Sequence, residues 1–404
     1  IILLILFAMF MYYNLYGYMD EWRARKEKDK EIKLKLKDID ALTKNILLLT
    51  FTKKAAQEML SRATIVLDSR CEQVAGGTFH SFANIILRKY SALLELKNNF
   101  TITDRTDSED IVNHIRANTI GKQEKRFPKK GTILDIYSKA VNKNIPSDEI
   151  ILKEYKQFEH CIEKINEIIK KYTEYKRTNS ILDYDDLLLY LRTLLEANPE
   201  IRKKLSNQYK YILVDEYQDT NTIQAQIIKL LASEHNNVMA VGDDSQSIYS
   251  FRGANFRNIL EFPEIFPNTK IIKLEQNYRS SQNVLALANE LLLKAKEKYS
   301  KTLFSTIESP IKPAIISASD MNTEAEFIVQ RVLELSEEEN IPLNDICVLA
   351  RSARMTYNLE IELAKRNIPY KKFGGMKFIE TAHIKDIIAH LRVILNPSDI
   401  ISYT

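Results

Sequence analysis

The chain has 404 residues, 45% of them hydrophobic and 28% charged, which is enough for two or three domains of ordinary globular composition. Its net charge of +4 is too small to indicate nucleic-acid binding, so any basic surface must come from local clustering. Three cysteines without a CxxC pair and six scattered histidines argue against a zinc site or a disulfide framework, and they fit a reducing cytoplasm.

The N-terminal stretch Ile1–Tyr13 is almost entirely apolar. It is short for a membrane span, which needs about 20 residues, and no basic segment precedes it as in a signal peptide. A truncated transmembrane helix, with membrane contact through residues 1–13, remains open. The following Glu21–Asp40 is dense in charges of both signs and indicates an exposed helical linker.

The next segments alternate between short strands and helices. Ile46–Leu49 has the apolar pattern of a buried strand, and Lys53–Ala63 indicates a helix that Thr52 caps at its N-terminus. Val74–Phe79 predicts another short strand, followed by a helix that runs to about Tyr90. This alternation is the beginning of an α/β pattern.

A different texture follows, because residues 100–179 are rich in Lys and Glu and carry apolar residues at helical spacing. We interpret them as a mostly helical insertion. The sequence LDYDDLL comes next, and its acids Asp183, Asp185 and Asp186 resemble a metal cluster at first sight. Acidic residues at the start of a helix are more simply explained as caps, so we expect them to begin the helix that follows.

The stretch Tyr209–Asn221, YKYILVDEYQDTN, is the most informative part of the chain. Its apolar run suits a strand that is buried on both faces of a parallel sheet, and Asp215 and Glu216 follow directly. Ligands of such sheets bind beyond the carboxyl ends of the strands. One carboxylate can hold a hydrated Mg²⁺ and the next can polarise a water that attacks a phosphate. Taken alone, the two acids are equally explained by a solvated strand end.

The rest of the chain continues the alternation of strands and helices. After a helix over Thr222–Ser233, the strand Asn237–Val241 ends in GDDSQ, and the strand Ile271–Leu274 ends in QNYRS. These polar strand ends predict a parallel α/β sheet. A second alternating block begins near Pro313. It comprises strands at Ala314–Ser317 and Ile346–Ala350 and helices at Glu324–Ser336, Met355–Arg366 and Thr381–Leu395.

Four polar clusters at strand ends, TFT, DEYQDTN, GDDSQSIYSFRGA and QNYRS, occur in this order. Together they resemble the UvrD/Rep/PcrA-type superfamily 1 DNA helicases, from about Asn45 to Asp399. The resemblance implies an α/β fold with a RecA-like parallel sheet core, a helical insertion and the start of a second RecA-like domain. The implied division is an apolar segment and charged linker (1–44), domain 1A (45–95 and 180–281), helical domain 1B (96–179) and a partial domain 2A (282–404).

The resemblance also implies a site for ATP and Mg²⁺ in the cleft between the two RecA-like domains. Asp215 is expected to hold the metal, Glu216 to activate water and Gln246 to sense the γ-phosphate. Tyr278 is expected to pack on the adenine and Arg279 to stabilise the charge of the transition state. Phosphoryl transfer depends mainly on positioned charge, and a planar guanidinium suits phosphate oxygens better than lysine does. We keep Asp243 only as a supporting group beside this site.

The implied partners are single-stranded DNA and junctions of single and double strands. Phe51, Tyr249 and Phe251 match positions that stack on bases, whereas Thr78, His80 and Arg252 match positions near the DNA backbone. Stacking tolerates any sequence and contributes about 1–3 kcal/mol per base, which suits a translocating motor. The family usually has Trp where this chain has Phe251, so we expect a weaker grip. Without the neighbouring motifs, plain core packing would explain these aromatic residues.

The phosphate-binding loop GxxxxGK[ST] of the family is missing from this chain. Among the 9 glycines, Gly121-Lys122 forms the only Gly-Lys pair, and Gln123 follows it inside the insertion. Backbone N–H groups and the lysine of such a loop bind the phosphates, so we expect poor ATP hydrolysis. The chain starts with Ile1 and stops at Thr404, and we expect a fragment of a longer reading frame.

Two functions therefore remain open. One is an ATP-dependent 3′–5′ DNA helicase or translocase, either alone or as the motor part of a helicase–nuclease subunit. The other is a non-enzymatic remnant that binds single-stranded DNA or a partner, with or without a membrane tether.

Overall fold

The computed structural model describes residues 43–66, 69–120, 126–250, 253–373 and 382–395. The chain divides into two compact units, residues 1–309 with 391–404, and residues 310–390. The apolar residues 1–13 and the charged segment 21–40 lie outside the described residues. None of the helices in the described ranges combines the length and the apolar character that a membrane span requires.

A four-stranded parallel sheet organises the first unit, with strand order β2-β1-β5-β6. Its strands are β1 (Ile46–Thr50), β2 (Ala75–Thr78), β5 (Tyr211–Val214) and β6 (Val238–Ala240). The four strands expected in this part of the chain are therefore confirmed. Their carboxyl ends lie at one edge of the sheet because all four strands run in the same direction.

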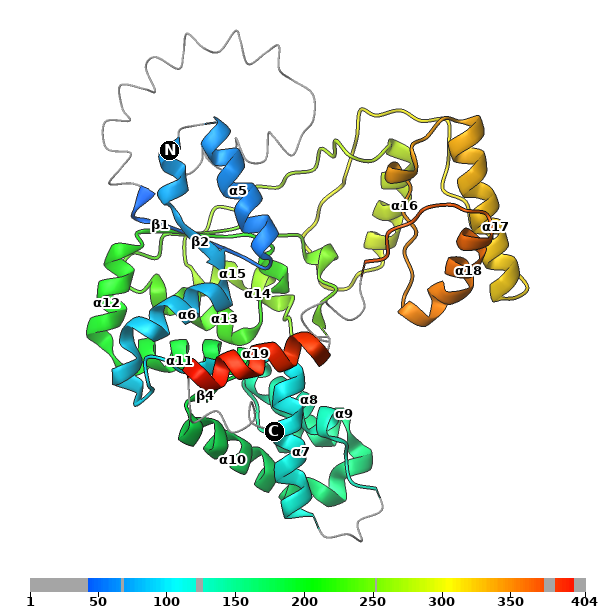
Figure 1. The fold of residues 1–404 in the computed structure, drawn as a ribbon. Helices are drawn as coiled ribbons and strands as arrows, with labels where there is room; N and C mark the ends of the chain where they lie inside the picture. Colours follow the sequence, from blue (N-terminus) through cyan, green and yellow to red (C-terminus); the bar gives the residue numbers. More distant parts are fainter. Residues whose placement is uncertain (1–42, 67–68, 121–125, 251–252, 374–381, 396–404) are drawn as a thin grey trace, which may run out of the picture. The chain divides into compact units, whose positions relative to one another are not determined.

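Side chains alternate between the two faces of the sheet. Leu47, Leu49, Ile212 and Val214 point into the largest hydrophobic core, with helices α6 (Phe79–Tyr90), α11 (Tyr184–Ala197) and α13 (Thr222–Leu231). These helices lie together beside the sheet in Figure 1. On the other face, α5 (Lys53–Val66) covers β1 and β2. The expectation that β5 is buried on both faces is wrong, because its residues alternate between buried and half-buried.

The helix starts follow local capping chemistry. Thr52 accepts a hydrogen bond from the N–H of Ala55 at 3.1 Å, and Asp183 accepts one from the N–H of Asp186 at 2.8 Å. The Asp186 side chain in turn accepts from the N–H of Asp183 at 3.0 Å, which completes a capping box. The expected caps are confirmed, and the acids of LDYDDLL begin a helix as expected.

The predicted insertion is mostly helical. It contains α7 (Arg105–Thr119), α8 (Lys130–Lys143), α9 (Ser147–Glu154) and α10 (Ile162–Asn179), which lie together in Figure 1. A separate hydrophobic core joins these helices. The short strands β3 (Thr101–Ile102) and β4 (Ile181–Leu182) pair in parallel at the entrance and exit of the insertion. The insertion is thus a folded module with its own apolar centre.

The strands expected at Ile271–Leu274, Ala314–Ser317 and Ile346–Ala350 do not form in the structure. Ile271, Ile315 and Leu349 are 51%, 99% and 91% exposed, so these apolar runs have no neighbouring strand to pair with in the described part of the chain. Three of the remaining helices lie close to their expected positions: α17 (Met321–Leu333), α18 (Tyr357–Lys365) and α19 (Ala382–Leu395). The sequence analysis did not predict α12 (Pro199–Gln208), α14 (Arg257–Leu260), α15 (Phe262–Ile265) or α16 (Gln282–Leu293).

Candidate nucleotide and nucleic-acid site

The carboxyl ends of β5 and β6 bring two of the predicted clusters together. The N–H of Asp215 bonds to Leu49 O at 3.0 Å, and the N–H of Val241 bonds to Val214 O at 2.8 Å. Asp215 and Glu216 therefore leave the sheet directly beside the loop that carries Gln246. Adjacent parallel strands place these residues at the edge where α/β sheets bind ligands.

Hydrogen bonds connect Glu216 to Gln246 through two intermediate residues. The side-chain amide of Gln218 donates to Glu216 Oε2 at 2.7 Å and accepts from the N–H of Asp243 at 3.0 Å. Asp243 Oδ2 then accepts from the Gln246 amide at 2.8 Å. Gln218 is buried, so its amide is fixed and can hold Glu216 and the Asp243 loop at constant positions relative to each other. Asp243 thus supports Gln246, whereas the sequence reading gave Gln218 no role.

The Asp215 carboxyl fits a cation site. Burial and then the charge of Glu216 raise the pKa of Asp215 to about 6. No lysine, arginine or histidine in the described ranges forms an ion pair with it. Hydrated Mg²⁺ is commonly held by one or two carboxylates and the phosphates of a nucleotide. No group of three or more His, Cys, Asp or Glu residues that could hold a metal ion occurs in those ranges.

The backbone at Glu216 is strained. Its φ of 52° lies in the left-handed region, which residues with a side chain avoid at a cost of about 1 kcal/mol or more. Glu216 is exposed, and its side chain accepts the bond from Gln218. Strain of this kind persists when the surrounding structure fixes it, here through the buried Gln218 and the flanking sheet.

Tyr278 and Arg279 lie in an extended segment that the sheet does not include. The Tyr278 hydroxyl donates to Gln276 Oε1 at 2.6 Å, and Asn277 Oδ1 accepts from the N–H of Arg279 at 2.9 Å. The exposed Arg279 guanidinium makes no hydrogen bond to the described residues. The structure does not bring these two side chains into contact with Asp215, Glu216 or Gln246.

An unpredicted lysine connects this segment to the Asp243 loop. The Lys301 ammonium pairs with both Asp243 and Asp244, the latter at 2.9 Å. Phe304, three residues later, pairs with the segment of Arg279: its carbonyl accepts from the N–H of Asn277 at 2.7 Å. Burial opposes both shifts, but the pairing outweighs it, so the pKa of Lys301 is raised and the pKa of Asp243 is lowered. No motif in the sequence indicated Lys301, because its partners are more than 50 residues away.

The aromatic residues predicted to stack on DNA meet in a hollow of about 440 Å³. The rings of Phe51 and Tyr249 lie 5.0 Å apart with an interplanar angle of 31°. The hollow is lined by Phe51, His80, Arg105, Asp135, Ser138, Lys139, Asn142, Asp185, Asp219, Asn221, Gln224, Tyr249 and Ala254. It joins residues of the first strand, the insertion and the loops after β5 and β6, and the sequence reading missed the residues from the insertion.

His80 and Thr78 lie at the start of α6. Thr78 caps this helix by accepting from the N–H of Ser81 at 3.2 Å. The His80 ring packs edge-on against Tyr184 at 5.8 Å, and burial lowers the pKa of His80 to about 4. The imidazole is therefore neutral near pH 7 and offers a hydrogen bond rather than a charge. Phe251 and Arg252 lie outside the described residues.

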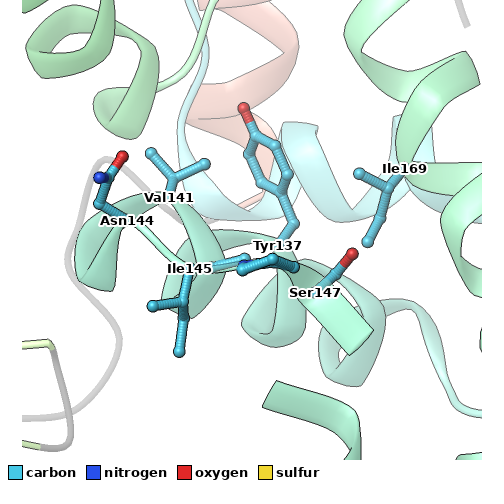
Figure 2. A pocket seen from close by; sticks show the side chains of 8 residues that line it. Tyr137, Val141, Asn144, Ile145, Ser147 and Ile169 are labelled. Atoms are coloured by element: carbon cyan, nitrogen blue, oxygen red, sulfur yellow. The ribbon is translucent and has the colours of Figure 1, made fainter. Parts of the chain in front are cut away.

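A second hollow of about 340 Å³ lies wholly within the insertion, as Figure 2 shows. Its walls are the apolar side chains of Tyr137, Val141, Ile145 and Ile169 and two others, and no charged side chain lines it. Its polar side chains are Asn144 and Ser147. A phosphate or a nucleic-acid backbone requires charge or a dense set of donors, so this hollow is not a second candidate for either.

A four-stranded parallel sheet with an acidic strand end, beside a hollow that contains two aromatic rings, is the architecture in which the comparisons with known proteins are made. Residues 31–267 match the family model described as the UvrD/REP helicase N-terminal domain, and residues 272–404 match the UvrD-like helicase C-terminal domain. The chain belongs to the UvrD/REP helicase family.

Its relatives include helicases from several bacteria. The chain is 36% identical to the ATP-dependent DNA helicase PcrA of Staphylococcus epidermidis over 91% of its own length and 50% of that protein. It is 37% identical to DNA helicase II of Rickettsia typhi, over 89% of its length and 54% of that protein. The PcrA helicase of Leuconostoc citreum is 34% identical over 90% of the chain and 48% of that protein. The chain thus spans about half the length of the curated relatives it matches.

Proposed function

We propose that the chain carries the DNA-binding residues and the residues that contact the γ-phosphate in an ATP-dependent 3′–5′ DNA helicase or translocase. The observation that carries this proposal is the hydrogen-bonded connection from Glu216 through Gln218 and Asp243 to Gln246. It links the two loops that would face the γ-phosphate and ends at the loop that holds Tyr249. A nucleotide bound beside Glu216 and Gln246 would thus lie next to the loop that also carries Tyr249. The direction of travel rests on the family alone.

In this proposal Asp215 would hold Mg²⁺ beside the phosphates, Glu216 would position and deprotonate the attacking water, and Gln246 would contact the γ-phosphate. When bound, Mg²⁺ neutralises phosphate charge. Arg279 would approach the transferred phosphoryl group, and its guanidinium, which is exposed and bonds to none of the described side chains, is available for this role. Tyr278 would stack on the adenine. The division into domains 1A, 1B and a partial 2A at residues 95, 179 and 281 is part of the same proposal.

Single-stranded DNA would enter the hollow of Phe51 and Tyr249, with Phe251 as a third stacking residue and with Thr78, His80 and Arg252 beside its backbone. Two aromatic rings at 5.0 Å are in contact, so a base would have to separate or cover them. Where the single strand of DNA continues into a duplex, the junction of single and double strands would lie beside the same hollow.

The sequence lacks GK[ST], so we propose that this chain binds DNA well and hydrolyses ATP slowly. Loss of the loop removes several charge-assisted hydrogen bonds, each contributing about 1.5–3 kcal/mol. The test has two parts. Binding of a fluorescent deoxythymidine oligomer is measured by anisotropy, and Tyr249→Ala is expected to weaken it about tenfold. Phosphate release is measured with and without that DNA, using Glu216→Gln as the control.

Equal DNA affinity of the wild type and Tyr249→Ala would contradict the DNA site. DNA-stimulated phosphate release that Glu216→Gln abolishes would contradict slow hydrolysis and would support the full enzyme activity. The two results are independent, since the first requires no nucleotide.

A further inference from the structure

Asn142 on α8 is a buried residue of the insertion that lines the hollow. Its Oδ1 accepts from the Asn221 amide at 2.6 Å, and its Nδ2 donates to Asp185 Oδ1 at 2.7 Å. Nδ2 also donates to Ser138 O at 2.9 Å, one turn earlier in the helix. Both ends of the amide are therefore occupied, and its orientation is fixed by a donor on one side and acceptors on the other.

The two partners of Asn142 belong to different motifs. Asn221 ends the DEYQDTN stretch and forms a capping box at the start of α13 with Gln224, with bonds of 2.8 and 2.9 Å. Asp185 lies in the first turn of α11, in LDYDDLL. Asn142 therefore links a helix of the insertion to the starts of two helices that pack on the sheet.

A third segment rests on the same side chain. Gly253 has a φ of 89°, and a Cβ added to it would lie 2.9 Å from Asn142 Cβ. The N–H of Ala254 bonds to Tyr249 O at 3.3 Å, and the N–H of Asn255 bonds to Thr220 O at 2.9 Å. The turn that carries the stacking residue Tyr249 thus lies directly on Asn142 and is bonded to the residue before Asn221.

We infer that Asn142 is a positioning residue, which holds the Tyr249 turn against the DEYQDTN loop so that the stacking pair keeps its geometry. This inference rests on the proposed function, because it assigns Tyr249 to DNA. An amide is required at this point: aspartate cannot donate to Asp185, and leucine can neither donate nor accept. The insertion is thereby part of the DNA site as well as a separately folded module.

The experiment is a double-mutant cycle on DNA affinity with Asn142→Ala and Tyr249→Ala. If Asn142 acts through Tyr249, Asn142→Ala alone weakens binding about tenfold, and it adds less than twofold when Tyr249 is already alanine. Asn118→Ala is the matched control, since Asn118 is exposed on α7 of the same insertion and bonds only to His114 among the described residues. Additive effects of the two substitutions would overturn the inference.

A second measurement needs no DNA. Hydrogen exchange is followed at the amides of Ala254 and Asn255, whose bonds to Tyr249 and Thr220 hold the turn. Asn142→Ala is expected to speed exchange there at least tenfold, while the amides of β1 stay protected. Unchanged exchange at both amides would overturn the inference even if the wild type bound no DNA. Failure of the wild type to bind DNA, together with faster exchange, would overturn only the proposed function.

Discussion

Removal of the Lys176 ammonium is the sharpest test of how the insertion is attached to the sheet domain. Lys176 on α10 is 2% exposed, and its Nζ lies 2.6 Å from carboxylate oxygens of both Asp183 and Asp186. The rings of Tyr137 and Tyr172 flank it at 4.6 and 4.3 Å from their centroids. Their hydroxyls donate to Asp186 at 3.1 Å and to Asp183 at 2.8 Å.

Methionine at position 176 keeps the length of the side chain and removes the charge. Two carboxylates then share a buried site without a cation. Removing one partner of a buried ion pair costs about 3–5 kcal/mol, and little of that cost comes from a cavity because the volumes are similar. We therefore expect Lys176→Met to lower the free energy of unfolding by about 4 kcal/mol at pH 8, measured by guanidinium unfolding with far-UV circular dichroism.

The unfolding free energy that Lys176→Met removes should depend on pH, and the direction of this dependence follows from the carboxyl groups. Burial and the charge of Asp183 already raise the pKa of Asp186 to about 7, and removal of the ammonium raises it further. A carboxyl whose native pKa lies above its unfolded value takes up a proton on folding, so stability is gained as pH falls through the native pKa. The penalty of Lys176→Met should thus shrink between pH 8 and pH 5.5.

Lys171→Met provides the control on the same helix. Lys171 pairs with Glu167 at 2.7 Å, but both side chains are about half exposed, at 44% and 50%. Exposed pairs contribute about 0–1 kcal/mol. A loss below 1 kcal/mol for Lys176→Met at pH 8, or a loss that is the same at pH 5.5, would refute the reasoning.

Two further substitutions test the sheet edge and the hollow. Gly242→Ala would place a Cβ 2.4 Å from Gln218 Oε1 and 2.8 Å from Ile259 Cδ1, so we expect a loss of about 1–3 kcal/mol in unfolding experiments. Gly76→Ala is the control, because its nearest neighbour is at 3.4 Å; equal losses would contradict this packing. His80 has a native pKa of about 4 against 6.5, so the unfolded chain binds more protons between these values and stability falls as pH drops from 6.5 to 4. His80→Gln should remove up to about 3 kcal/mol from the decrease in unfolding free energy between pH 6.5 and 4. If the unfolding free energy of the variant depends on pH as that of the wild type does, the imidazole is not desolvated.

The sheet and its caps could be predicted from the sequence because their causes are local. The apolar run of β5, the acids that follow it and the Asp183 cap are all signalled within a few residues. Gln218 stands inside the DEYQDTN motif and could have been considered as the partner of Glu216. These features need no knowledge of distant parts of the chain.

The errors and omissions have long-range causes. Ile271–Leu274 has the composition of a strand, but a strand requires a neighbour, and local composition does not supply one. Asn142 and Lys301 are single polar residues whose partners lie 43 to 79 positions away. Their roles arise only when the fold brings those segments together, so no local pattern could have indicated them.

The pairing of β3 with β4 places both ends of the insertion one strand spacing apart, about 5 Å. A module with adjacent ends and its own apolar centre can be exchanged for another without changing the path of the surrounding chain. The same geometry offers a graft point, at which another folded segment replaces 103–179, because parallel strands require a long connection. The incoming segment would have to supply again the contacts that the insertion makes with the rest of the chain, among them those of the Asn142 amide and the Lys176 ammonium.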